Sequence, residues 1–253
     1  MKASAEPKPR RGGFVLFAFF ILIALGVLVA LGTWQLDRKA WKEALIAQLD
    51  TKLAAQPTDL PARERWQRLD AATDEFRRVA FPAEFLAGQE ALVYSSGSSL
   101  RPDAVGPGYW VFAPARLTGG SIVVVNRGFV PEGRQNPDTR KQGQVGGVVD
   151  IVGVMRWPEA RGEFTPKDEP EKGLWFARDP ASMAAAKSWG SIAPFYIDQE
   201  APAVPGSLPK VGPLKASLPN NHLQYAVTWY GLAAVILIAA IFFWRARRRT
   251  ASS

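Results

Sequence analysis

The sequence predicts an integral membrane protein in which two transmembrane helices, N-terminal and C-terminal, flank a β-rich, mainly antiparallel domain. That domain is expected to be barrel- or sandwich-like, with a short internal helix. Residues 14–31 and 225–244 are apolar runs without a charged residue. Between them, short runs rich in valine, phenylalanine and isoleucine alternate with glycine and proline turns. The chain contains no cysteine, so its core alone, without disulfides, must hold the central domain together.

The first apolar run has the length of a membrane span. About 20 helical residues cross a hydrocarbon core of about 30 Å, and residues 14–34 are the expected first transmembrane helix. A cleaved signal is the alternative, because Ala30-Leu31-Gly32 resembles a small-residue cleavage site. The apolar region exceeds the roughly 7–15 residues of a signal, which favours an uncleaved anchor. Trp34, Arg38, Trp41 and Leu45 then recur at helical spacing, so the helix should continue as an amphipathic segment until Pro57.

The region after this helix divides into short candidate strands. They cover residues 77–85, 90–94, 109–117, 121–125, 148–155, 174–176 and 195–197. Turns such as Gly119-Gly120 and Gly146-Gly147 favour antiparallel connections over βαβ crossovers. Residues 179–189 are the expected internal helix, and the proline-rich residues 201–219 an extended linker.

The net charge of +8 is concentrated at the two ends of the chain. Residues 1–12 carry +3 and residues 245–249 carry +4. Basic residues just outside two spans predict cytoplasmic tails over 1–13 and 245–253, a domain over 35–221 on the opposite side of the membrane and a second span over 222–244. No basic stripe remains between the spans for nucleic acid to follow, which argues against nucleic-acid binding.

The only histidine, His222, lies at the entrance to the second span. Asn220 and Asn221 are natural N-caps, which would place His222 in the first turn of that helix. Trp229 lies seven residues on, two turns deeper on the same face. A neutral imidazole above an aromatic ring is suited to ligate iron in a planar macrocycle. The alternative is an ordinary interfacial residue, because rings with a polar edge favour that zone.

Two further features lie beside the spans. Arg38, one turn beyond Trp34, could pair with an anionic group such as a propionate, or extend toward lipid phosphates. The small-residue spacings Gly26-x3-Ala30 and Gly231-x2-Ala234 would let the two helices pack closely on each other, or onto a partner's helices.

Nucleophilic catalysis has little support in this sequence. The sole imidazole is tied to the membrane boundary, there is no cysteine, and no GxSxG motif is present. The carboxylates of Asp168, Glu169 and Glu171 lie between prolines, which favours a solvated turn over an acid–base pair. The sequence therefore does not predict an enzyme, and an exported hydrolase is the weakest hypothesis.

Five sequence blocks, in order between the two spans, carry a resemblance to a known family. They are GTWQLDRKAWKEALI (32–46), GYWVFAP (108–114), VVVNRGFVP (123–131), FTPKDEPEKGLWFARDPASMA (164–184) and NNHLQYAVTWYGLA (220–233). From Gly32 to about Ala234 the chain resembles the surfeit locus protein 1 family. It differs at Phe129, where that family usually has tryptophan, and around Gly173, where asparagine often stands.

The resemblance implies a non-enzymatic assembly factor for haem-copper cytochrome c oxidase. It implies non-covalent binding of haem a and assistance in its insertion into subunit I, with haem a synthase as a further possible partner. His222 is then the implied axial ligand of the haem iron, with Trp229 packing nearby and Arg38 contacting a propionate. The expected location is a bacterial inner membrane, with residues 35–221 in the periplasm. The alternative is a membrane scaffold that stabilises an oxidase intermediate without holding cofactor.

Overall fold

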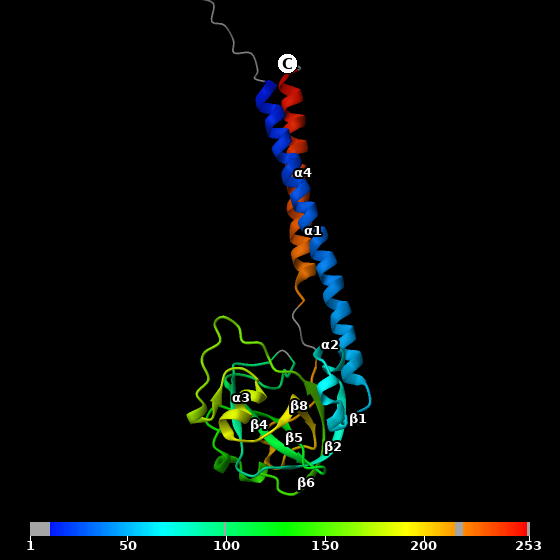
Figure 1. Cartoon of the computed structure of the whole chain (residues 1–253). Helices are drawn as coiled ribbons and strands as arrows, with labels where there is room; N and C mark the ends of the chain where they lie inside the picture. The colour runs from blue at the N-terminus through cyan, green and yellow to red at the C-terminus, as the bar shows by residue number, and fades with distance from the viewer. Residues whose placement is uncertain (1–10, 99, 216–219, 252–253) are drawn as a thin grey trace, which may run out of the picture. The chain divides into compact units, whose positions relative to one another are not determined.

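The computed structural model describes residues 11–98, 100–215 and 220–251. The chain forms two compact units. The helix unit comprises Met1–Leu45 and Pro219–Ser253, and the barrel unit comprises Ile46–Leu218. The helix unit contains most of α1 (Arg11–Ala54) together with α4 (His222–Ala251), which lie side by side in Figure 1.

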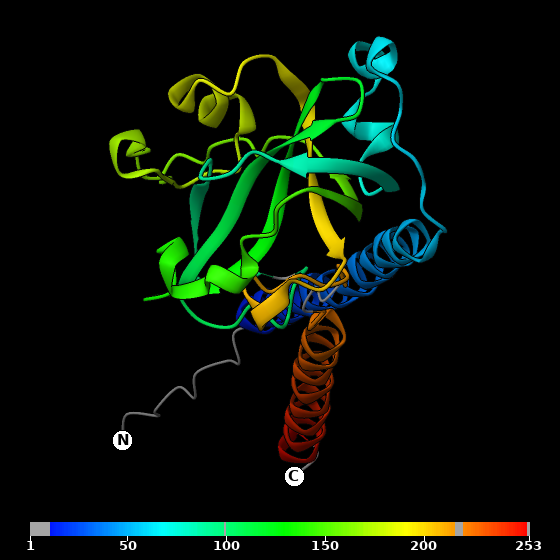
Figure 2. The same cartoon turned by 90° about the horizontal axis from the view of Figure 1, so that it is seen from below.

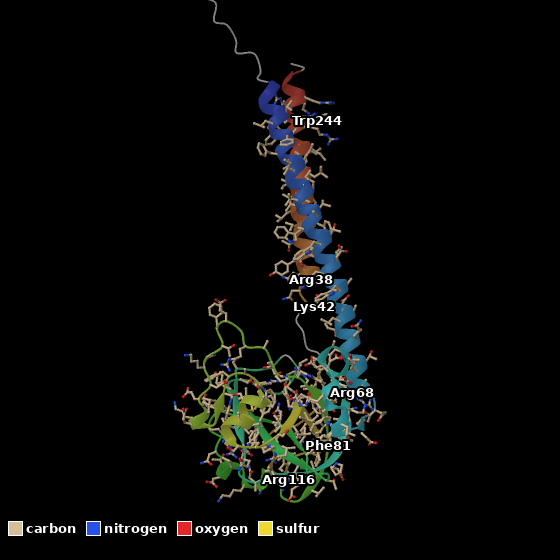
Figure 3. The ribbon with its side chains drawn as sticks, in the orientation of Figure 1. Arg38, Lys42, Arg68, Phe81, Arg116 and Trp244 are labelled. Carbon is tan, nitrogen blue, oxygen red and sulfur yellow. The ribbon has the colours of Figure 1, made fainter. Side chains whose placement is uncertain are left out.

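Both long helices are candidate membrane spans. Their apolar windows are only 6% and 11% buried, and large side chains such as Phe19, Leu22 and Phe242 are exposed. Figure 3 shows side chains projecting outward along both helices. Water strongly disfavours so much contiguous apolar surface, whereas lipid accommodates it, so the helices support a membrane protein. The membrane limits 14–34 and 222–244 remain predictions, because α1 runs without interruption to Ala54.

The facing sides of α1 and α4 follow an alternating spacing of three and four residues. Partly or fully buried positions include 18, 21, 25, 28, 32 and 35 on α1, and 222, 226, 229, 233, 236 and 240 on α4. This spacing keeps one stripe of each helix toward its neighbour, as in coiled-coil packing. Phe17 and Phe243 meet farther along the pair, with ring centroids 5.1 Å apart.

The small-residue spacings expected to mediate this packing are not the ones that do. Gly26 and Gly231 have no atom within 4 Å of an added Cβ, and Ala30 and Ala234 are exposed. The close contact is instead at Gly32, where a Cβ would lie 2.8 Å from the Tyr230 ring. For the packing of α1 on α4 the expectation was wrong, because Gly26 and Gly231 lie off the facing stripe and local spacing alone does not indicate which way a helix faces. Packing of these residues onto a partner's helices stays a prediction.

The barrel unit is built on one eight-stranded sheet. Its strands are β1 (Thr58–Asp59), β2 (Arg78–Phe85), β3 (Ala91–Ser95), β4 (Gly108–Leu117), β5 (Ile122–Pro131), β6 (Val148–Arg156), β7 (Leu174–Trp175) and β8 (Ile192–Ala201). The helices are α2 (Ala71–Asp74) and α3 (Pro180–Lys187), with 3-10 turns η1 (Arg63–Arg68), η2 (Pro137–Gly143), η3 (Pro170–Lys172) and η4 (Pro205–Ser207).

Five of these strands close into a barrel. The sheet order β2-β6-β8-β5-β4 returns to β2 through a β2–β4 pairing, and the strands wrap around one core in Figure 2. Most pairings are antiparallel, as expected, while β5–β8, β1–β2 and β3–β7 are parallel. Val123 and Val125 of β5 point into the barrel core, and Val124 packs with Trp175 and α3 on the outside. Both faces of β5 are therefore buried.

Two strands are longer than the sequence predicts. Residues 121–125 and 195–197 mark only parts of β5 and β8, which continue through Asn126, Arg127, Asp198 and Gln199. These polar side chains end an apolar run in the sequence, yet Asn126 Nδ2 donates to Asp198 Oδ1 at 2.6 Å across the parallel pair. The side chains thus satisfy one another, and the strands continue. The predicted internal helix corresponds to α3, and the short strand β1 was not predicted.

Both departures from the family pattern have a local explanation. Phe129 packs edge-on against Trp110, with ring centroids 5.4 Å apart. Gly108 leaves room for it, since an added Cβ would lie 2.4 Å from the Phe129 ring. Gly173 ends η3 with φ +66°, a left-handed conformation that asparagine also tolerates. Glycine and asparagine therefore satisfy the same backbone requirement at position 173.

A second buried polar cluster fastens η2 to the barrel. Glu90 lies between the guanidinium groups of Arg127 and Arg140, and also accepts from Gln144 Nε2 at 3.1 Å. The Arg127 and Arg140 side chains are only 3% and 1% exposed. Burial lowers the pKa of Arg127, with the nearby charge of Arg140 acting in the same direction and Glu90 opposing both. The single carboxylate therefore compensates two buried cations.

Removing that carboxylate should strongly destabilise the barrel unit. We expect Glu90→Ala to lower the free energy of unfolding by about 3–5 kcal/mol, because it leaves the buried cations of Arg127 and Arg140 without their carboxylate partner. Urea unfolding followed by tryptophan fluorescence measures the change. Glu169→Gln, which breaks the exposed pair with Lys172, is the control and should change stability by less than about 1 kcal/mol. Equal midpoints for the two variants would contradict this role of Glu90.

The contact at Gly32 gives a matched test of helix packing. Gly32→Val should lower cross-linking between cysteines placed at Phe17 and Phe243, because the new side chain collides with Tyr230. Gly26→Val adds the same atoms where nothing lies within 4 Å and should leave the yield unchanged. The absence of native cysteine makes a short bifunctional thiol reagent specific. Equal losses in both variants would refute the assigned facing stripe.

Candidate functional site

His222 is the first residue of α4 and is half-buried. Asn221 takes the N-cap position, since its carbonyl accepts from Tyr225 N at 3.2 Å. The position was thus predicted correctly, although neither asparagine side chain makes a capping bond among the described residues. Asn220 Oδ1 is instead buried without a partner. The helix start therefore fixes where the imidazole lies.

Gln35 of α1 holds the imidazole in one orientation. Its Oε1 lies 2.7 Å from His222 Nδ1. Because an amide oxygen only accepts, Nδ1 carries a proton, and in the neutral imidazole this tautomer leaves the lone pair on Nε2. This is the arrangement in which metal-bound histidines are held, with the remote ring nitrogen donating to a fixed acceptor. A role for Gln35 was not predicted from the sequence. Gln35 could have been found as the polar residue on the facing stripe of α1, two residues before Asp37.

A second polar contact lies two turns along α4 from this imidazole. Thr33 Oγ1 donates to Val29 O at 3.0 Å, so the Tyr230 hydroxyl, 3.0 Å from the same oxygen, is the donor to Thr33. Two hydrogen bonds therefore join polar side chains of α1 and α4: Thr33 with Tyr230, and Gln35 with His222. Each such hydrogen bond is worth about 1 kcal/mol in a membrane, and both fix the register of the helices.

The structure brings together only part of the predicted site. Trp229 lies on the same facing stripe as His222 and is partly buried, as expected from the spacing of seven residues. Arg38, labelled in Figure 3, is exposed, and its guanidinium stacks 4.0 Å from the Trp41 ring centroid. No hydrogen bond, ion pair or ring contact of the described residues joins Arg38 to His222 or Trp229. A propionate contact for Arg38 therefore remains a prediction.

The other acid groups have structural roles. Asp168 accepts from Arg161 at 2.6 Å and from Phe176 N at 2.9 Å, which fixes the turn around it. Glu169 pairs with Lys172 on the surface. Among the described residues, no three histidine, cysteine or carboxylate side chains form a group that could hold a metal ion. Iron bound within a macrocycle, needing one axial nitrogen, is the metal chemistry that His222 fits.

Comparison with known proteins fixes the family. The SURF1 family model matches residues 22–234. The chain belongs to the SURF1 family. It is 37% identical to a SURF1-like protein of Monosiga brevicollis, over 96% of this chain and 92% of that protein. It is 35% identical to surfeit locus protein 1 of Rattus norvegicus, over 87% and 72%, and 36% identical to that of Homo sapiens, over 80% and 69%. These relatives are eukaryotic, so the expected bacterial origin stays a prediction.

The sole histidine allows a direct test of the site's geometry. Gln35→Leu should shift the His222 tautomer away from the Nδ1–H form, because it removes the acceptor that selects this form. Nitrogen-15 spectra of protein labelled at histidine report the tautomer from one imidazole without overlap. Gln224→Leu, on an exposed position of α4, should leave the spectrum unchanged. An unaltered tautomer in Gln35→Leu would remove Gln35 from the site.

Proposed function

We propose that this SURF1 family member binds haem a without a covalent bond and assists its insertion into subunit I of cytochrome c oxidase. The observation that carries the proposal is the His222–Gln35 hydrogen bond, which leaves Nε2 available as an axial ligand. The bound haem would supply the redox-active iron. The chain's own residues would position the group, with His222 as ligand and Trp229 as a packing surface on the same stripe.

The chain has few side chains of the types that commonly serve as axial ligands of haem iron. There is one histidine and no cysteine. Met155 and Met183 are fully buried in the barrel unit, which leaves neither sulfur accessible to a macrocycle. Met1 lies outside the described residues. The proposed site is therefore five-coordinate, or is completed by water or by a partner protein.

The location belongs to the same proposal. The expected topology places both basic tails in the cytoplasm and the central domain in the periplasm of a bacterial inner membrane. Asp37 is the first charge after the apolar run of α1, so His222 and Gln35 lie where the span meets water. An amphiphilic macrocycle favours that zone, because it has an apolar body and charged propionates. Subunit I and haem a synthase are the proposed partners.

The test uses protein purified from cells that make haem a. We expect absorption spectra and pigment extraction to show stoichiometric haem in the unaltered protein and its loss in His222→Ala, because no other imidazole can replace the ligand. Gln224→Ala is the matched control on α4. Gln35→Leu should weaken binding without abolishing it, by roughly tenfold, as expected for loss of an orienting partner.

Three outcomes would contradict the proposal. Equal haem content in His222→Ala would exclude His222 as the ligand. A bis-imidazole spectrum from monomeric protein would contradict the single-ligand site. Haem in neither protein would favour the alternative function, a scaffold that stabilises an oxidase intermediate through its membrane helices and the exposed residues Trp34, Arg38 and Trp41.

A further inference from the structure

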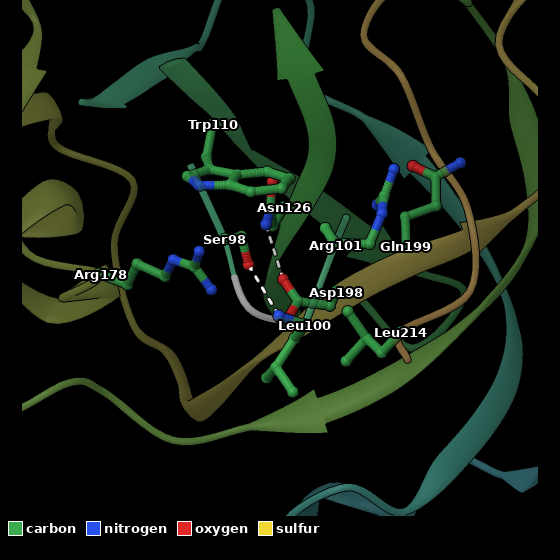
Figure 4. Close-up of a pocket in the computed structure, with 9 residues that line it drawn as sticks. All are labelled: Ser98, Leu100, Arg101, Trp110, Asn126, Arg178, Asp198, Gln199 and Leu214. Atoms are coloured by element: carbon green, nitrogen blue, oxygen red, sulfur yellow. Dashed lines mark hydrogen bonds between the residues drawn. The ribbon is translucent and has the colours of Figure 1, made fainter. Parts of the chain in front are cut away.

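The barrel unit contains a polar cleft outside the helix unit and its proposed haem site. Its volume is about 390 Å³, within the usual range of about 300–1,000 Å³ for small-molecule sites. The loop 95–98 forms one wall, with Trp110, Arg156 and Arg178 on others. Figure 4 shows a narrower adjoining hollow, which shares Ser98, Leu100, Trp110 and Arg178 with the cleft.

Two donors face this cleft, and one of them lacks an acceptor. Trp110 is 2% exposed, and its Nε1–H has no hydrogen-bond partner. The Arg178 guanidinium stacks 4.9 Å from the Trp110 ring centroid, and both side chains project toward the hollow in Figure 4. Its nearest carboxylate, Glu159 Oε1, lies 3.6 Å from Nε, beyond hydrogen-bond length. The Arg178 side chain also lies close enough to the Tyr196 hydroxyl to interact with it.

The neighbouring acid groups are already engaged. Asp198 accepts from Asn126 at 2.6 Å and from Arg156 at 3.2 Å, and Arg156 also donates to Glu75 at 3.1 Å. Arg178 pairs with the 44% exposed Glu159 and lies beside Tyr196. Gln199 Oε1 also lacks a partner, but lies across the hollow from Arg178 in Figure 4. The side of the cleft formed by Arg178 and Trp110 therefore offers the unsatisfied Nε1–H of Trp110 beside a guanidinium that is paired with a partly exposed carboxylate.

Tyr196 adds a third donor to the same cluster. Its hydroxyl is fully buried and has no partner in hydrogen-bonding geometry, although it lies close enough to Arg178 and Asp198 to interact with their charges. Burial raises the pKa of Tyr196, and the charge of Asp198 raises it further, so the hydroxyl stays protonated at neutral pH. The cluster thus combines the unsatisfied Trp110 Nε1–H with the Tyr196 hydroxyl beside the Arg178 guanidinium. An added acceptor would relieve the cost of leaving these buried donors unsatisfied.

We propose that this cleft binds the anionic oxygen group of a small molecule, a carboxylate or a phosphate, through the Arg178 guanidinium and the Trp110 Nε1–H. The planar guanidinium matches two such oxygens at once, and its stacking on Trp110 fixes its plane. Glu159 competes for Arg178 and lowers the affinity. The site does not depend on haem binding, since all of its residues belong to the barrel unit.

The test is calorimetric titration of the full-length protein with inorganic phosphate and, separately, with succinate, at constant ionic strength set with chloride. Saturable binding of either probe is expected, and the stronger one identifies the ligand class. Arg178→Gln should weaken binding at least tenfold and Trp110→Phe several-fold, whereas Glu159→Gln should strengthen it. Arg65→Gln, at an exposed position of η1, is the charge-matched control and should leave binding unchanged.

Several results would overturn the proposal. No saturable binding of either probe would do so, as would equal affinities in Arg178→Gln and Arg65→Gln. Circular dichroism checks that Arg178→Gln folds. If it does not, the opposite effects expected of Glu159→Gln and Trp110→Phe decide the question. His222→Ala should bind the probe normally, which separates failure of this proposal from failure of the haem proposal.

Discussion

Each polar group that this chain removes from water needs a partner, and this constraint governs both units. In the barrel unit it places Glu90 between Arg127 and Arg140, and Asp198 between Asn126 and Arg156. In the helix unit it pairs polar side chains of α1 with polar side chains of α4 across an apolar seam. The apolar residues supply most of the burial free energy, but they tolerate many arrangements. The polar pairs select one of them.

Groups that break this constraint point to binding. His222 uses one ring nitrogen toward Gln35 and leaves the other without a described partner, at the edge of a membrane span. Trp110 and Arg178 line a cleft in which the Trp110 Nε1–H has no partner. A buried polar group without a partner costs stability, so each such group calls for an explanation. Under the two proposals these sites take different ligands, an axial metal in one case and an anion in the other, and the units would have separable binding roles.

The sequence predicts what depends on local pattern and misses what depends on pairing across distance. The spans, the helix to Ala54, the start of α4 at His222 and most strands follow from periodicity and caps. Gln35 was missed because its meaning comes from a residue 187 positions away. The ends of β5 and β8 were missed for the same reason, since Asn126 and Asp198 resemble turn residues until they are paired. The spacings at Gly26 and Gly231 gave a wrong prediction for the packing of α1 on α4, because small-residue spacing does not indicate the direction that a helix faces.

A single imidazole suits a protein that passes haem on more than one that retains it. Under the proposed function, the chain contributes one strong axial ligand, and its methionines with described positions are buried in the barrel unit. A receiving protein that offers two axial ligands would bind the same group more tightly, so transfer would run downhill without an energy source. Gln35 would then set the balance between capture and release of the haem. It would orient His222 for capture, but its neutral amide polarises the imidazole less than a carboxylate would, which would keep a bond from His222 to iron weak enough to release.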